Sequence, residues 1–562
     1  MGDPLCYPKF CRKETGSMRV VKRLLCVLFA VTVLLGESAA VVSKDTDRQD
    51  APKTEYTLEN SRFTNYLDGY SILLEGDYTV DLSMAEVAAI LMSHDTRIEI
   101  YKQDLDSFTL NDYVSYSNGF LANTLEHHVI SRGWRWIGGR RVYVTAWYRD
   151  KLQRVENDKN YYATFDMAEG EHVYSVFVKT AVPFDSAERF YGLVESFTTV
   201  ESTEHTTPWS SKAADLEERG WNAETELFYR TYLLEQGRLS WGIYEPDFVH
   251  GFSDQILYYE KVLACDFTVV LCYSHFYHDP AEVPYEDMGV LLEQAWSRGQ
   301  VLELTLQATD VGNGTNMMYA ILQGEYDTYL RWYAKTIADF AHPVLFRLHN
   351  EMNGDWCPYA GYRTSKDPVI CNEVYRYIYG IFEECGANRN TIWVWNPNSR
   401  SFPEFDWNHS LMYYPGDEYV DVVGMTAYNT GTYYARYGEK WQEFETLYAD
   451  LYEEYCRLYA QPLMITEFSC ANMGGDKNRW VENMFSVIIR YDRIKIAVWW
   501  DHCDYDRSGN VARSYVLDET PELLKIFRKN IGYHSYVFRG PKGCWSIPYY
   551  GAPEKGFLEK RG

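Results

Sequence analysis

The sequence predicts an α/β protein in which a (β/α)8 TIM barrel follows a small α+β domain. Three observations support this prediction: the length of 562 residues, a change of pattern near residue 236, and short apolar runs that alternate with helical periodicity beyond it. A chain of this length exceeds one compact core, and a barrel of this type takes roughly 250 residues as one unit. Hydrophobic residues make up 46% and charged residues 24%, which is typical of a globular protein.

The amino-terminal segment has the pattern of an export signal. Three basic residues within 19–23 precede an uncharged, mostly apolar run at 24–35, and small residues follow. This order is typical of a secretory signal peptide, and the run is shorter than the roughly 20 apolar residues that a membrane span needs. We expect residues 1–40 to be a signal peptide, or an uncleaved signal anchor, with Met18 as an alternative start. The protein is then secreted, and residues 41–55 are a polar linker.

Residues 56–200 predict a first folded unit. Runs rich in β-forming residues at 141–148 and 172–178 predict strands, and apolar residues share one helical face at 186–197. We therefore expect a small α+β domain, whose role the sequence leaves open. Residues 201–235 are acidic and polar and predict a connector.

From residue 236 to residue 532, eight apolar runs alternate with segments of helical period. The runs predict strands at 239–244, 267–273, 301–306, 343–348, 391–395, 420–425, 462–466 and 494–500. Between them, the segments 325–340, 372–384 and 439–456 repeat apolar residues on one helical face. Eight such alternations are typical of a (β/α)8 barrel. The alternative, an open doubly wound sheet, would need a glycine-rich phosphate turn after its first strand, which the sequence lacks. We expect residues 533–562 to form a carboxyl-terminal tail after the barrel.

The charge balance excludes one class of partner. Acidic residues number 80 and basic residues 54, so the formal net charge is −26. This field repels polyanions, and we expect no nucleic-acid partner. Aromatic residues make up 16% of the chain. Their flat rings either fill large cores or stack on sugar rings, and both interpretations stay open at this point.

Two carboxylates follow predicted strands that lie far apart in the sequence. Glu351 comes after the fourth strand and Glu467 after the seventh. The active site of a barrel lies where strands end and the following loops begin, so both should reach one cavity. Two carboxylates on either side of a sugar can protonate the leaving oxygen and attack the ring, which indicates a glycosidase. For either Glu alone, a structural ion pair is the alternative.

Four segments near predicted strand ends form a distinctive set, which is LHNEMNGDW at 348–356, WVWNPNS at 393–399, YYPGDEYVDVVG at 413–424 and ITE at 465–467. Taken in order, these segments carry a resemblance to glycoside hydrolase family 26. This resemblance covers residues 236–532 and implies a clan A barrel with catalytic Glu residues on strands four and seven. The best-known members are β-mannanases, and others cut mixed-linkage β-glucan or β-1,3-xylan.

The resemblance implies a role for each residue of the site. Glu351 would be the general acid/base and Glu467 the nucleophile of a retaining endo-glycosidase that works by double displacement. Tyr428 would hydrogen-bond the nucleophile, and Trp499 or Trp500 would form the floor under the reacting sugar. A retaining mechanism places the two carboxyl groups about 5–5.5 Å apart. We therefore expect burial and the charge of Glu467 to raise the pKa of Glu351.

Further residues around the motif have expected supporting roles. Asn350 should bond the sugar 2-hydroxyl, and Trp356 is a candidate sugar platform. Arg347 and His349 should brace the site as a cation and a polar partner. Family mannanases commonly carry His directly before the acid/base Glu, whereas Asn350 stands there in this chain.

The substrate predicted from these features is a β-linked polysaccharide, most simply β-1,4-mannan. A lichenase or a β-1,3-xylanase of the same family stays open. A non-catalytic carbohydrate-binding protein on a barrel is the alternative from another class. We expect a monomer with no cofactor and no metal.

Overall fold

The computed structural model describes residues 56–531 with nine gaps, which are 82, 106–107, 204–208, 214, 236–238, 247, 249–252, 284–287 and 310–313. The predicted signal segment 1–40, the linker 41–55 and the tail 533–562 lie outside the described residues. Within the described part, no helix combines the length and the apolar character that a membrane crossing requires.

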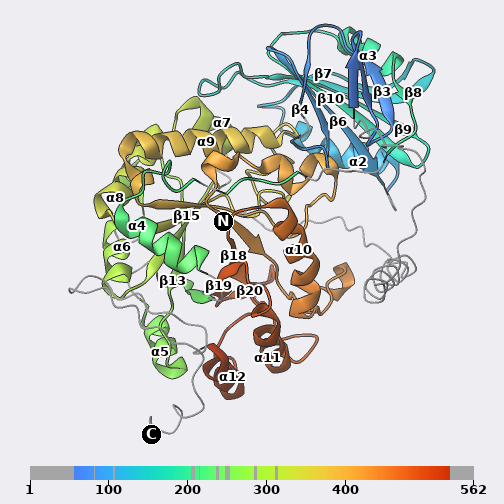
Figure 1. The fold of residues 1–562 in the computed structure, drawn as a ribbon. Coiled ribbons are helices and arrows are strands. Elements are labelled where there is room, and N and C mark those ends of the chain that lie inside the picture. The colour runs from blue at the N-terminus through green and yellow to red at the C-terminus, as the bar shows by residue number, and fades with distance from the viewer. Residues whose placement is uncertain are drawn as a thin grey trace, which may run out of the picture.

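Eight parallel strands close into a barrel, as the sequence predicts (Figure 1). In order around the barrel they are β12 (Ser240–Tyr244), β13 (Val269–His275), β14 (Val301–Gln307), β15 (Val344–Leu348), β16 (Thr391–Trp395), β17 (Val422–Thr426), β18 (Leu463–Phe468) and β19 (Ile494–Trp500). Strand β12 pairs with β19 and closes the barrel. Each of the eight predicted runs overlaps one of these strands, so the predicted fold class is confirmed.

Helices cover the outside of the barrel. They are α5 (Asp254–Leu263), α6 (Met288–Ser297), α7 (Met317–Gln323), α8 (Asp327–Phe340), α9 (Pro368–Cys385), α10 (Phe444–Leu458), α11 (Lys477–Ile488) and α12 (Pro521–Ile531). The connection from β16 to β17 instead contains three short 3-10 helices, η7 (Asp406–Asn408), η8 (Ser410–Tyr413) and η9 (Asp417–Tyr419). After β19, the short strands β20 (Cys503–Tyr505) and β21 (Val511–Ser514) form a hairpin.

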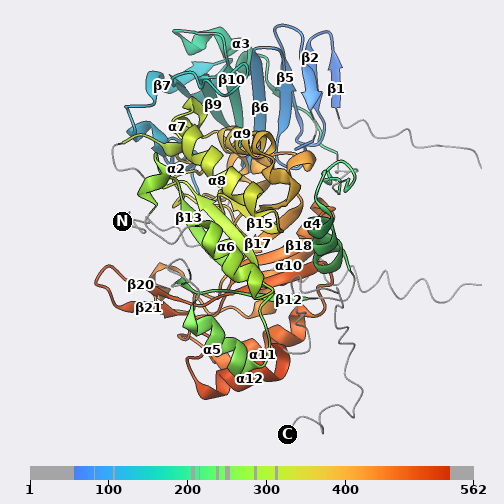
Figure 2. The same ribbon diagram turned by 90° about the vertical axis from the view of Figure 1, so that its left-hand side faces the viewer.

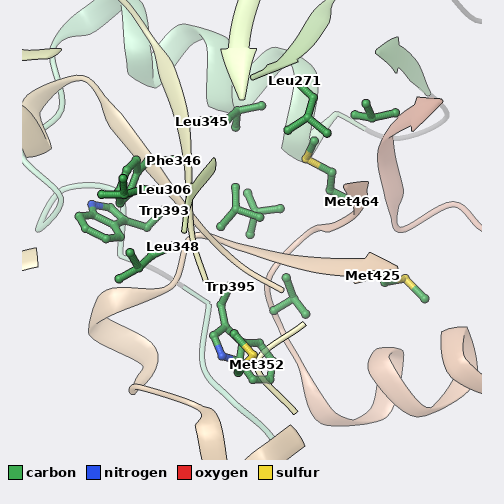
Figure 3. Close-up of a cluster of buried hydrophobic side chains, with 14 of the residues drawn as sticks. Leu271, Leu306, Leu345, Phe346, Leu348, Met352, Trp393, Trp395, Met425 and Met464 are labelled. Carbon is green, nitrogen blue, oxygen red and sulfur yellow. The ribbon is translucent and has the colours of Figure 1, made fainter. Parts of the chain in front are cut away.

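The strands pack against the helices through apolar side chains (Figure 3). The ring of Phe346 in β15 lies 4.8 Å from the ring of Trp393 in β16 and 4.7 Å from that of Phe382 in α9. Burying one side chain of this size contributes about 1.5–3 kcal/mol. This apolar layer holds the strands in place.

At the carboxyl ends of β13, β14 and β15, the side chains that point into the barrel are polar. In the pairing register, Tyr273 of β13 lies beside Thr305 of β14, and Thr305 lies beside Arg347 of β15. Successive residues of a strand point to opposite faces, so Phe346 and Arg347 face the helices and the interior respectively. The barrel interior therefore receives polar groups at the level where the site forms.

The amino-terminal domain consists of two antiparallel sheets that share a buried core. The larger sheet has the order β4-β5-β6-β10-β9-β8-β7, and the smaller has the order β1-β2-β3-β11. Their bounds are β1 (Tyr56–Glu59), β2 (Arg62–Asn65), β3 (Tyr70–Leu73), β4 (Thr79–Asp81), β5 (Ala89–Met92), β6 (Thr96–Asp104), β7 (His128–Ile137), β8 (Arg140–Tyr148), β9 (Tyr161–Glu169), β10 (His172–Thr180) and β11 (Thr198–Thr199). Helix α2 (Leu110–Ser117), the 3-10 turn η2 (Ala187–Phe190) and helix α3 (Tyr191–Glu195) complete the domain, the last two within the predicted helix 186–197.

The predicted connector runs along the barrel. It contains α4 (Ala223–Phe228) and a π-helical turn, η3 (Tyr229–Leu234). The backbone N–H of Ser211 donates to the carbonyl of Leu458 at 2.8 Å. The hydroxyl of Tyr229 donates to the carbonyl of Asp421 at 2.9 Å. These contacts tie the connector to the barrel.

The larger amino-terminal sheet lies against the barrel near α7 and α9 (Figures 1 and 2). Trp147, Tyr162 and Phe177 on one face of this sheet belong to the same buried hydrophobic cluster as the barrel core. The opposite face, which includes Val144 and Phe165, packs on the smaller sheet. The domain is therefore joined to the barrel by a continuous core.

A buried ion-pair network crosses this boundary. The Lys179 ammonium lies 2.8 Å from a carboxylate oxygen of Glu99 and 2.6 Å from one of Asp367, and all three side chains are buried. Arg97 lies 2.6 Å from Glu99. Despite the cost of burial, Lys179 and Arg97 lower the pKa of Glu99 to about 2. The network therefore joins the amino-terminal sheet to the residue that precedes α9.

We predict that Lys179→Met destabilises the whole chain. The substitution removes the ammonium partner of both Asp367 and Glu99, and breaking a buried pair typically costs about 3–5 kcal/mol. Urea denaturation of the full chain measures the loss. As a matched control, Lys525→Met removes an exposed partner of Glu522 and should change stability by less than about 0.5 kcal/mol. Equal stability of the two variants would contradict the importance of the network.

Candidate active site

Glu351 and Glu467 lie in one site at the carboxyl end of the barrel. Glu467 is buried near the end of β18, and Glu351 is partly exposed three residues beyond β15. The Asn350 side-chain nitrogen donates to Glu467 Oε1 at 3.0 Å, so the residue that precedes one carboxylate contacts the other. The negative charge of Glu467 also raises the pKa of Glu351.

Four groups donate to the carboxylate of Glu467. Its Oε1 accepts from Asn350 at 3.0 Å and lies 3.3 Å from Arg347 Nη1. Its Oε2 accepts from the hydroxyls of Tyr428, at 3.2 Å, and of Tyr273. Hydrogen bonds and a cation both favour the charged form of a carboxylate. The surroundings of Glu467 therefore suit an oriented, ionised nucleophile.

The surroundings of Glu351 suit a group that exchanges a proton. Burial, followed by the negative charge of Glu467, raises its pKa to about 7. Hydrogen bonds from Asn398 and Trp356 and the charge of Arg347 act in the opposite direction. A carboxyl group with a pKa near the working pH can serve both as a general acid and as a general base.

The backbone that carries Glu351 adopts an unusual conformation. His349 and Glu351 have φ angles of 53° and 57°, in the left-handed region. The N–H of His349 donates to the carbonyl of Leu306 at 3.1 Å, and the N–H of Glu351 donates to the carbonyl of Asn396 at 2.8 Å. Such residues cost about 1–3 kcal/mol each and persist only where neighbours hold them. The segments on either side of β15 thus fix the backbone that directs Glu351.

A buried cation lies beneath the two carboxylates. The side chain of Arg347 is fully buried, and its Nε lies 3.1 Å from Glu303 Oε1. It donates to Thr305 Oγ1 at 2.8 Å and to Asn396 Oδ1 at 2.9 Å. Burial raises the pKa of Glu303 to about 8, so this carboxyl group is mostly neutral at neutral pH. The carboxylate oxygen Oε1 of Glu467 lies 3.3 Å from Nη1 of the same guanidinium.

Two partly exposed tryptophans lie beside the carboxylates. Trp500 stacks on Tyr244, with ring centroids 5.3 Å apart, and meets Tyr428 edge-on at 6.1 Å. Trp356 packs beside Phe402 at 5.2 Å. Flat accessible rings at these positions suit stacking against sugars.

The predicted role of Trp499 in substrate binding is wrong. Its ring is buried outside the barrel, 5.0 Å from Phe527 of α12 and 5.4 Å from Phe468. Its indole N–H donates to the carbonyl of Tyr515 at 3.0 Å. Adjacent residues of a strand face opposite sides, so only Trp500 of the pair can reach the site.

The predicted polar role of His349 is also wrong. The ring is buried and stacks on Tyr359, with centroids 4.5 Å apart, while Phe276 lies 6.0 Å away. Among the described residues, neither ring nitrogen has a hydrogen-bond partner. Burial lowers the pKa of His349 to about 3, so the ring is neutral and acts by packing.

Asn350 contacts the other carboxylate of the site, and its contact with a sugar 2-hydroxyl stays a prediction. Its amide nitrogen donates to Glu467, and its oxygen accepts from Gln307 at 2.5 Å. In this structure it orients the carboxylate of Glu467. Arg347 is the buried cation that the sequence predicts.

Sequence reasoning missed Tyr273, Glu303 and Asn398. Glu303 stands in a predicted apolar strand, with Thr305 and Gln307 at alternate positions, and this alternation was a usable signal for polar residues that face the interior. Tyr273 ends the second predicted strand, and Asn398 lies within the segment 393–399. Nothing in their local sequence indicates a contact with either carboxylate.

Comparisons with known proteins show similarity to a family of glycosyl hydrolases. The sequence model of glycosyl hydrolase family 26 matches residues 305–449, a span that contains Glu351. This match confirms the predicted resemblance. The chain is 29% identical over 255 residues to Endoglucanase H of Acetivibrio thermocellus, which covers 44% of this chain and 25% of that protein. It is 35% identical over 94 residues to a mannan endo-1,4-beta-mannosidase of Bacillus subtilis, which covers 16% of this chain and 24% of that protein. The chain thus spans about a quarter of the length of these curated relatives.

A solved endo-beta-1,4-mannanase from Cellulomonas fimi shares 17% identity, with 56% of this chain and 74% of that chain covered and a TM-score of 0.43.

We predict that Glu467→Gln lowers the pKa of Glu351 from about 7 toward the ordinary value of a glutamate, about 4.3. The substitution removes the nearby negative charge that disfavours ionisation of Glu351. Carbon-13 NMR of labelled glutamate carboxyl groups follows the titration. The surface variant Glu522→Gln should leave it unchanged, and an unaltered titration in Glu467→Gln would show that the two groups do not interact.

Proposed function

We propose, from the confirmed resemblance of the barrel to glycoside hydrolase family 26 and from the paired carboxylates, that the chain is a retaining endo-glycosidase acting on a β-linked polysaccharide. The observation that carries the proposal is the contrast between two carboxyl groups of one site. Glu467 accepts hydrogen bonds from three neutral groups and faces Arg347, whereas the pKa of Glu351 is raised to about 7. Environments that separate two carboxyl groups in this way assign one as the acid and the other as the nucleophile.

In the first step, Glu467 attacks the anomeric carbon while Glu351 gives its proton to the glycosidic oxygen. The bond from the anomeric carbon to that oxygen breaks, and a covalent glycosyl ester forms on Glu467. Formation of this ester removes the negative charge that kept Glu351 protonated. The pKa of Glu351 then falls just before it must act as a base.

In the second step, Glu351 takes a proton from water, and the oxygen of that water attacks the anomeric carbon. Glu467 leaves as a carboxylate and recovers the hydrogen bonds from Tyr273 and Tyr428. These preorganised donors stabilise the charge as it returns to the leaving carboxylate.

The proposed substrate is β-1,4-mannan, which agrees with the mannan endo-1,4-beta-mannosidases among the relatives. A β-glucan is the second candidate, because the match to Endoglucanase H extends over 255 residues. We also propose that the protein is secreted, on the pattern of residues 19–40. This location would bring the enzyme to extracellular polysaccharides.

The proposal is tested by incubating the purified protein with mannan, lichenan, β-1,3-xylan and xylan and measuring released reducing ends. We expect mannan to be cleaved fastest. Glu351→Gln and Glu467→Gln should each lower turnover by about 10³-fold or more, because each removes one partner of the chemistry. NMR of the first-formed product should show retained anomeric configuration.

Glu522→Gln, which alters a surface carboxylate, is the control and should keep the parental rate. Near-parental rates in both active-site variants would refute the assigned roles. Binding to a polysaccharide without any released ends would favour the non-catalytic alternative.

The rate should also depend on pH through Glu351. The general acid must be protonated, so kcat/KM should fall as the pH rises through about 7, the pKa of Glu351. Asn398→Ala removes a hydrogen bond that lowers this pKa, and the basic limb should then move to higher pH. A pH–rate profile of both proteins measures the shift. If the basic limb stayed in place or moved to lower pH, it would not report the ionisation of Glu351.

A further inference from the structure

The loop between β15 and α9, residues 349–367, carries Glu351 and is strained at both ends. The φ angles are 53° at His349 and 57° at Glu351, and they are 59° at Ser365 and 56° at Lys366. Each left-handed residue of this kind costs about 1–3 kcal/mol, so the surroundings must hold the loop in this shape. Contacts within the barrel hold the first end. The second end requires another support.

The amino-terminal domain supplies that support. Asp367, the residue that caps α9, accepts from Lys179 Nζ at 2.6 Å and from the hydroxyl of Tyr162 at 3.2 Å. The buried ammonium of Lys366 lies 5.4 Å from the ring centroid of Tyr113. Lys179, Tyr162 and Tyr113 all come from the amino-terminal domain. The strained end of the loop is therefore fixed by side chains that lie outside the barrel.

The middle of the loop contacts helix α2 of the same domain. The hydroxyl of Tyr116 donates to a carboxylate oxygen of Asp355. The rings of Tyr116 and Tyr362 lie 5.1 Å apart. Beyond α2, Gly119 meets Tyr362 so closely that an added Cβ would lie 2.5 Å from its hydroxyl oxygen. The loop and the domain thus fit together without room for a larger side chain.

A short path connects this contact with the proton donor. Tyr116 holds Asp355, and the next residue, Trp356, lies close enough to Glu351 to lower the pKa of its carboxyl group. A shift of Asp355 would move Trp356 and, through it, the carboxyl group that must meet the glycosidic oxygen. Misplacement of a catalytic group by about 1 Å can cost about 10²-fold in rate.

We infer that the amino-terminal domain is an integral part of the active site, in which Tyr116 and Lys179 are positioning residues that hold the loop 349–367 and aim the proton donor Glu351. This inference rests on the proposed function, because it assumes that Glu351 donates a proton. It assigns a catalytic purpose to residues 56–200, whose role the sequence leaves open.

The variant Tyr116→Phe tests the inference in the full chain, because it removes one hydroxyl and keeps the ring. We compare kcat/KM for galactomannan with kcat/KM for 2,4-dinitrophenyl β-mannobioside. Departure of an alkoxide from a polysaccharide needs a well-placed proton, whereas dinitrophenolate leaves without one. We expect a loss of about tenfold or more on galactomannan and of less than about twofold on the dinitrophenyl glycoside.

Two further variants separate positioning from general damage. Tyr174→Phe removes a hydroxyl of the same domain that donates at 2.9 Å to the carbonyl of Asp68, and it should leave both rates unchanged. Adding Tyr116→Phe to Asp355→Ala should cause no further loss on galactomannan, because the two side chains act as one pair. Equal losses on both substrates in Tyr116→Phe, or no loss on galactomannan, would overturn the inference.

Failure of the proposed function would look different, since the parent protein itself would cleave neither substrate. Amide hydrogen exchange then decides the inference about the loop. The segment 349–367 should exchange faster in Tyr116→Phe than in the parent and in Tyr174→Phe. Unchanged exchange in Tyr116→Phe would overturn the inference.

Discussion

The buried guanidinium of Arg347 is the interaction on which the rest of the site depends. A fully buried cation is costly unless neighbouring groups compensate its charge and its hydrogen bonds. Here Thr305 and Asn396 accept hydrogen bonds, and Glu303 and Glu467 lie within ion-pair distance. The planar fork of an arginine reaches these partners at once, which the single ammonium of a lysine could not do.

Around this cation, three carboxyl groups have three different surroundings. Glu303 is deeply buried and has a pKa of about 8, so its neutral form prevails near neutral pH. Glu467 receives Arg347 and three further donors, which suit a carboxylate. Burial, followed by the nearby negative charge of Glu467, raises the pKa of Glu351 to about 7. The proposed retaining hydrolysis uses this difference between Glu467 and Glu351.

The site also depends on the contacts that hold the loop carrying Glu351. Glu351 sits on a strained loop, and strain persists only where the surroundings over-determine the conformation. The barrel fixes one end through Leu306 and Asn396, and the amino-terminal sheet fixes the other through Lys179. The shared hydrophobic core between the sheet and the barrel makes this arrangement rigid. Fold and chemistry are therefore coupled across two domains.

The sequence by itself determined the eight strands and placed Glu351 and Glu467 at strand ends, because strand periodicity and chain order are local signals. It also indicated Arg347, Trp356, Tyr428 and Trp500. Only the tertiary structure decided which of two adjacent tryptophans faces the site, since a shift of one residue reverses the faces of a strand. It alone brought Tyr273 to Glu467, 194 positions away, and Tyr116 to Asp355, 239 positions away. Such contacts arise from barrel closure and domain packing, and no local pattern in the sequence encodes them.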